Sequence, residues 1–159
     1  MGIGDTYPQL EAARMRSLVW AALAAAACTP GDKPGAGAPA GPARKYAGTW
    51  EGRAFHSEAD TGTPFRIASS VAEDGSLRGT LTFPQVPEPP IPVRARQVSD
   101  TALVNEIGPY QSPSAHRRVL TTTTGRLHGD SLNGTFEMRP VEGGNAIMSG
   151  TFRSKRVVP

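Results

Sequence analysis

The chain has 159 residues, which is enough for one ordinary domain. Its 17 basic and 14 acidic residues give a net charge of +3, and the basic residues are dispersed along the sequence. Proteins that bind nucleic acids gather Lys and Arg on one face, so we expect no nucleic-acid partner.

The first segment has the pattern of a secretory signal peptide. Arg14 and Arg16 precede eleven apolar or small residues, 17–27. This stretch is too short to span a hydrocarbon core, which needs about 20 residues. We therefore predict that residues 1–27 are a signal peptide. Residues 1–8 contain an acidic residue and a proline and no positive charge, which does not fit a signal peptide, so we expect translation to begin at Met15.

The single cysteine lies where this signal peptide ends. The segment Ala25-Ala26-Ala27-Cys28 resembles the lipobox of bacterial lipoproteins, in which small residues precede a lipid-modified cysteine. The resemblance implies cleavage before Cys28, lipidation of Cys28, and an exported protein anchored to a membrane of the cell envelope, on the periplasmic or outer-membrane side. The alternative is an ordinary signal peptide that is cut near Ala27, with Cys28 incidental.

A tether is expected after the cysteine. Residues 29–43 are rich in Pro, Gly and Ala and contain no large apolar side chain, so they cannot bury enough surface to offset the entropy of ordering. We assign residues 28–43 to the lipidated cysteine and a flexible linker, and residues 44–159 to one domain.

The domain has the two-residue period of β-strands with one buried and one wet face. The clearest alternating apolar sets are Phe65, Ile67 and Val71; Leu77, Leu81 and Phe83; and Leu132, Phe136 and Met138. Less regular strands are expected near 46–56, 91–98, 102–107, 117–127 and 145–155. Because about eight strands appear and no segment has a helical stripe, the domain is predicted to be all-β, either a closed barrel or a sandwich.

Turn signals favour the barrel with a meander connection. Asp74-Gly75, the segment 128–130 and the segment 142–145 each place glycine between two expected strands. Short turns join antiparallel neighbours, so we predict a single antiparallel meander barrel of about eight strands.

Glycine also recurs within the strands. An apolar residue, any residue, Gly, Thr and an apolar residue follow one another in 46–50, 77–81, 132–136 and 148–152. Alternate strand residues share a face, so each glycine is expected to point inward between two bulky side chains. Such glycines mark bends or the close approach of another backbone, which a small barrel needs in order to close.

Two short motifs resemble those of lipocalin-like barrels. Gly48-Thr49-Trp50 is similar to the Gly-x-Trp of the first strand in lipocalin-type proteins, and the hairpin from Asp74 to Thr80 is similar to hairpins in such domains. The resemblance spans 46–155 in pattern. It implies a small apolar ligand in the barrel interior, and the candidate contacts are Trp50, Phe83, Phe136 and Phe152.

Catalytic and metal-binding patterns do not stand out. His56, Glu58 and Asp60 offer one imidazole and two carboxylates, but no second histidine lies at ligand spacing, so we expect a solvated loop. We predict a non-enzymatic protein without metal or cofactor.

Two segments, 84–92 and 108–116, are expected to be loops that are long enough to be functional; the alternative is that they are plain connections over a barrel end. They support an alternative to ligand binding, in which the protein has a filled core and acts as a structural or interaction protein of the envelope, with these loops as its contact surface.

Overall fold

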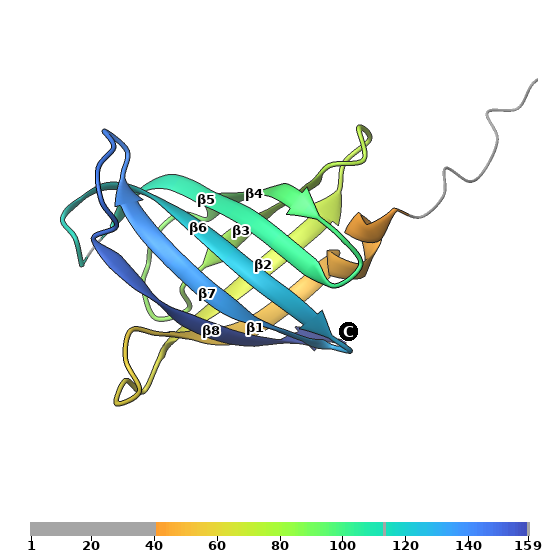
Figure 1. Ribbon diagram of the computed structural model, residues 1–159, viewed down its shortest axis with the longest axis horizontal. Helices are drawn as coiled ribbons and strands as arrows, with labels where there is room; N and C mark the ends of the chain where they lie inside the picture. Colours follow the sequence, from red (N-terminus) through yellow and green to blue (C-terminus); the bar gives the residue numbers. More distant parts are fainter. Residues whose placement is uncertain (1–40, 113, 159) are drawn as a thin grey trace, which may run out of the picture. The chain divides into compact units, whose positions relative to one another are not determined.

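A computed structural model describes residues 41–112 and 114–158 as an eight-stranded antiparallel β-barrel (Figure 1). A 3₁₀-helix, η1 (Pro42–Tyr46), precedes the barrel. The strands are β1 (Gly48–Phe55), β2 (Thr63–Val71), β3 (Leu77–Thr82), β4 (Ile91–Val98), β5 (Ala102–Ser112), β6 (Arg117–His128), β7 (Ser131–Pro140) and β8 (Met148–Val157). The predicted all-β fold is confirmed.

The barrel is a meander, as the turn signals predict. Each strand pairs with the next in the sequence, and β1 pairs with β8 to close the ring. The turn between β2 and β3 places Gly75 at φ +78°, a backbone conformation that suits glycine. The Asp74 carboxylate accepts hydrogen bonds from the backbone and the hydroxyl of Ser76, which fixes this turn.

The chain enters the barrel differently from the expectation. Residues 42 and 43 were assigned to the linker and no helix was expected, but η1 begins at Pro42 and buries Ala43 and Tyr46. Proline is favourable in the first helical turn because its fixed φ suits the helix and its missing N–H would have no intrahelical partner there. Tyr46 lies three residues after Ala43, so one turn directs both side chains to the core.

The first part of one predicted loop belongs to a strand instead. Strand β5 was expected to end near residue 107, with a functional loop over 108–116, but the strand continues to Ser112. The pairing of β5 with β6 shifts register between Ile107 and Tyr110, so a bulge at Gly108 interrupts the alternation without ending the strand. The other predicted loop does connect β3 to β4, because no strand lies between Thr82 and Ile91.

Inward glycines let neighbouring backbones approach one another. A Cβ atom on Gly134 would lie 1.9 Å from the Thr124 carbonyl oxygen, and one on Gly150 would lie 2.0 Å from that of Phe55. Gly79 is similarly placed, as the pattern predicts. The first copy of the pattern differs because Tyr46 belongs to η1 and Gly48 is exposed, so Gly52 takes this role in β1.

Candidate ligand cavity

One end of the barrel is covered by η1, and we call it the closed end (Figure 1). Trp50 is 2% exposed there, and its indole N–H donates to the Tyr46 carbonyl at 2.9 Å. Arg156 lies opposite Trp50 in the β1–β8 pairing, with its guanidinium 4.4 Å above the indole ring. The same guanidinium donates to the carbonyl oxygens of Lys45 and Ala47, so it ties β8 to η1 and the start of β1.

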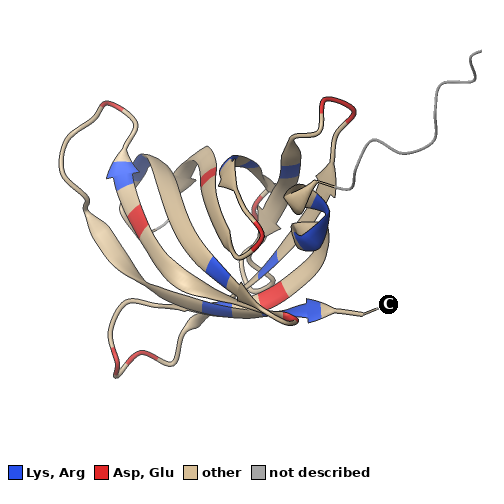
Figure 2. Cartoon of the chain, turned by 45° about the vertical axis from the view of Figure 1, so that its right-hand side comes forward, with Lys and Arg blue, Asp and Glu red and all other residues tan. Residues whose placement is uncertain are grey.

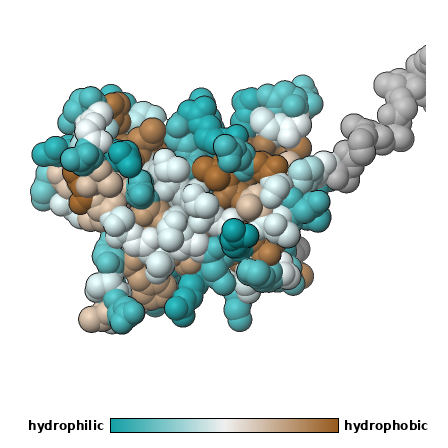
Figure 3. Space-filling view, in the orientation of Figure 1, coloured by the Kyte–Doolittle hydropathy of each residue, from teal (hydrophilic) through white to brown (hydrophobic). Residues whose placement is uncertain are grey.

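The opposite end, which we call the mouth, carries the longer connections β1–β2 (56–62), β3–β4 (83–90) and β7–β8 (141–147). Val141 and Ile147 flank the last of these and are 47% and 42% exposed. Apolar surface is visible among the loops at this end of the molecule (Figure 3, left). The mouth therefore presents apolar side chains to the outside.

A cavity of about 300 Å³ occupies the barrel interior. Its lining is predominantly apolar and reaches from Tyr46 at the closed end to Phe83 and Val86 at the mouth. Phe65 and Phe152 face each other edge to face inside it, with their ring centroids 6.3 Å apart. The volume matches the lower limit of small-molecule sites, which is about 300 Å³.

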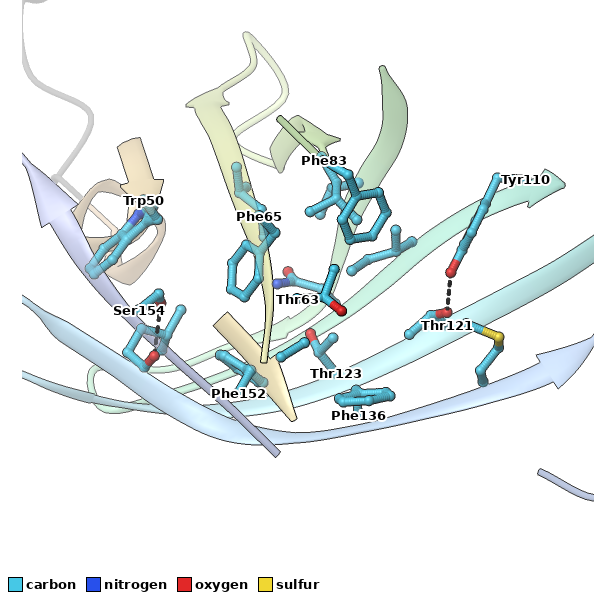
Figure 4. Close-up of a pocket in the computed structure, with 18 of the residues that line it drawn as sticks. Trp50, Thr63, Phe65, Phe83, Tyr110, Thr121, Thr123, Phe136, Phe152 and Ser154 are labelled. Carbon is cyan, nitrogen blue, oxygen red and sulfur yellow. Dashed lines mark hydrogen bonds between the residues drawn. The ribbon is translucent and has the colours of Figure 1, made fainter. Parts of the chain in front are cut away.

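The structure places all four sequence-predicted contacts in the lining of this cavity (Figure 4). Trp50 lies towards the closed end, Phe83 lies at the start of the β3–β4 loop, and Phe136 and Phe152 come from β7 and β8. These side chains share the cavity because alternate residues of a strand point to the same face. Three of them lie on the inner face of a strand, and Phe83 continues the inner face of β3 one residue beyond its end. Their contact with a ligand stays a prediction.

No Asp, Glu, Lys or Arg side chain of the described residues lines the cavity. Basic residues of the described chain lie in strands or η1, and most acidic residues lie in connecting loops (Figure 2). The titratable groups in the lining are His56, Tyr46 and Tyr110. Burial raises the pKa of both tyrosines above the ordinary value, and the charge of Asp100 adds to the rise for Tyr46. Both phenols are therefore neutral at physiological pH.

Asp60, in the acidic loop after β1, has a structural role. The Asp60 carboxylate accepts hydrogen bonds from the backbone N–H groups of His56, at 2.9 Å, and Gly62, at 2.8 Å. These two bonds hold the pKa of Asp60 below its ordinary value. Across residues 41–112 and 114–158 no three His, Cys, Asp or Glu side chains gather as a metal would require.

Sequence reasoning missed the polar residues of the interior. Asn105 lies on the inner face of β5 between Leu103 and Ile107; on β6, Thr123 is paired with Asn105 and Thr121 with Ile107. The alternation of Leu103, Asn105 and Ile107 was a usable signal, because residues two apart share a face. Residues 121–124 are all threonine, so apolar and polar residues do not alternate there, and the sequence alone does not tell which of the four side chains point inward.

Cys28, the predicted signal peptide and the linker as far as residue 40 lie outside the described residues. In the part of the chain that the structure describes, no helix is long and apolar enough to cross a membrane. No protein-family model matches the chain, and no curated protein is similar to it in sequence.

Proposed function

We propose that the protein holds a small, largely apolar molecule inside its barrel, and that it does so as an exported protein anchored by a lipid on Cys28. The observation that carries the binding proposal is the cavity of about 300 Å³ with its apolar lining. An eight-stranded barrel either fills its interior with side chains or leaves room for one small ligand, and the hollow supports the second case.

The size of the cavity limits the ligand. A methylene group fills about the space of a water molecule, ~30 Å³ in the liquid, so the cavity accepts on the order of ten non-hydrogen atoms. Burying that apolar surface contributes about 25 cal/mol per Å² to binding. The alternative of a filled core with loops as the contact surface is disfavoured by the hollow interior and by the strand that replaces the predicted loop at 108–112.

Equilibrium dialysis with 2-ethylnaphthalene tests the binding proposal. We expect saturable binding of one molecule per chain. Ala54→Leu adds bulk to the cavity lining and is expected to weaken binding at least tenfold. The matched control, Ala68→Leu, makes the same change at an exposed position of β2 outside the cavity and is expected to bind like the wild type. Equal effects of the two variants would count against a site inside the barrel.

The anchor is tested separately, by membrane fractionation and intact-mass measurement of the protein from a bacterial host. The mature chain is expected to begin at Cys28, to carry added lipid mass and to sediment with membranes. Cys28→Ser should lose both the mass and the sedimentation, while Thr29→Ser should keep them. A wild-type chain without added lipid mass contradicts the anchor and leaves the binding proposal untouched.

A further inference from the structure

Two polar side chains face each other in the middle of the apolar cavity. Asn105 of β5 and Thr123 of β6 are directly paired in the sheet, and they are only 6% and 9% exposed. Both line the cavity, and Figure 4 shows the Thr123 side chain directed into it. Above and below Asn105 the wall is apolar, since Leu103 and Ile107 are each 4% exposed.

Four other polar side chains of the lining are satisfied by the protein itself. The Ser154 hydroxyl donates to the Leu132 carbonyl at 2.8 Å, and the Ser69 hydroxyl donates to the Tyr46 carbonyl at 2.7 Å. The hydroxyls of Tyr110 and Thr121 are hydrogen-bonded at 3.2 Å (Figure 4, dashed line). These side chains have their partners without a ligand.

Asn105 and Thr123 differ in this respect. Within residues 41–112 and 114–158, neither the Asn105 amide nor the Thr123 hydroxyl takes part in a side-chain hydrogen bond, although both are buried and line the cavity. The Tyr46 hydroxyl, at the closed end of the lining, is also without a partner among these residues. A primary amide offers two donors and two acceptor sites, and a hydroxyl offers one donor and two acceptor sites. Buried polar groups are normally hydrogen-bonded, so this pair calls for a partner inside the cavity.

The lining also determines the charge of that partner. A carboxylate or ammonium group in an apolar cavity needs an opposite charge, and no Asp, Glu, Lys or Arg of the described chain faces this one. His56, the one imidazole of the lining, lies at the mouth and is exposed. The partner is therefore uncharged. Because the pair both donates and accepts, the group that fits it does the same.

We propose that the ligand carries an uncharged hydroxyl or primary amide group, which binds to the Asn105 amide and the Thr123 hydroxyl while its apolar part fills the cavity. This inference rests on the proposed binding function and names the ligand class. It assigns specificity to β5 and β6, whereas the aromatic residues Phe65, Phe136 and Phe152 provide apolar contact.

Three compounds of one shape test the inference by equilibrium dialysis: 2-naphthalenemethanol, its apolar isostere 2-ethylnaphthalene, and the anion 2-naphthoate. The wild type is expected to bind the alcohol about tenfold more tightly than the isostere, the size of one well-formed hydrogen bond. The anion is expected to bind weakest of the three. A wild type that binds the alcohol and the isostere equally, or that prefers the anion, overturns the inference.

Variants assign the preference to the two side chains. Asn105→Leu and Thr123→Val keep the approximate shapes, and each is expected to bring the affinity ratio of alcohol to isostere close to one. Thr124→Val, the same change at an exposed neighbour of Thr123, should leave the ratio unchanged. Melting temperatures verify folding, and the wild-type ratio is informative even if one variant fails to fold.

The outcomes separate the two proposals. If any of the three compounds binds but the variants leave the ratio unchanged, ligand binding stands and the role of Asn105 and Thr123 falls. If none of the three binds to the wild type at its solubility limit, the proposed binding function itself is contradicted.

Discussion

The closed end and the mouth of the barrel differ in what their aromatic and charged side chains do. At the closed end Trp50 is 2% exposed, stacks under Arg156 and donates to the Tyr46 carbonyl. At the mouth Phe83 is half-buried at the start of a loop, and Val141 and Ile147 are exposed. The comparison favours a stabilising role for the closed end, and under the proposed binding function we expect the ligand to enter at the mouth. Matched substitutions at the two ends test this division.

The largest difference is expected for the two aromatic residues. Trp50→Ala removes a buried ring together with its stacking on Arg156, and should lower the free energy of unfolding by about 4 kcal/mol. Phe83→Ala, at a half-buried position, should cost about 1 kcal/mol and mainly weaken the binding of 2-ethylnaphthalene. Urea denaturation and dialysis measure the two quantities. Equal losses of stability would abolish the distinction between the ends.

The second largest difference is expected between Arg156 at the closed end and Arg139 at the mouth. Arg156→Met removes the hydrogen bonds to the Lys45 and Ala47 carbonyls and should cost about 2 kcal/mol. Arg139→Met breaks an exposed ion pair with Glu137 at the mouth, and such pairs contribute only about 0–1 kcal/mol. Thermal unfolding of both variants provides the comparison. An Arg139 effect as large as that of Arg156 would show that surface pairs, and not the closed end, hold the barrel together.

The smallest effects are those of the tyrosine hydroxyls, and they are expected to have opposite signs. The buried Tyr46 hydroxyl has no hydrogen-bond partner among the described residues, so Tyr46→Phe should stabilise the protein by about 1 kcal/mol. Tyr110→Phe removes the bond to Thr121 and should destabilise it by about the same amount. Destabilisation by both substitutions would mean that the Tyr46 hydroxyl is satisfied.

The pH dependence sharpens the Tyr46 result. Burial raises the pKa of Tyr46, so the folded protein keeps this proton at pH values where the unfolded chain loses it. This contribution to stability is complete below about pH 10 and is lost as pH rises through the higher pKa of the folded state. The advantage of Tyr46→Phe over the wild type should therefore be larger near pH 11 than at pH 7. Denaturation curves at the two values provide the measurement.

Much of the fold follows from local sequence pattern. The alternation in segments such as Phe65–Val71 predicts that the segment is a strand, which of its faces is buried, and its register with the neighbouring strand. The glycines of the repeated pattern mark the places where neighbouring backbones come close. The same alternation placed Trp50, Phe83, Phe136 and Phe152 around one cavity. Whether that interior was hollow could not be predicted, because cavity volume depends on the packing of side chains from all eight strands.

The misses have identifiable causes. The helix at Pro42–Tyr46 is stabilised by burial against strands that are remote in sequence, and its own residues carry no periodic signal. Beyond Ile107, Gly108 and the proline after it resemble a loop, yet the pairing with β6 resumes at Tyr110. Asn105 was overlooked because a polar residue interrupts the alternation of apolar residues that identifies the buried face of a strand. Here that polar residue is part of the candidate site.

The pairing of β1 with β8 has a further consequence, for folding and association. All other pairings join strands that are consecutive in the sequence, whereas Arg156 reaches the Ala47 carbonyl across 109 positions. This seam carries the largest loop-closure entropy, so we expect it to form last. Until it forms, β1 and β8 are open edges with unpaired backbone groups, which invite pairing with another molecule. Because Arg156 links the end of β8 to the entry of β1, we expect it to help keep this seam closed and its two edges covered.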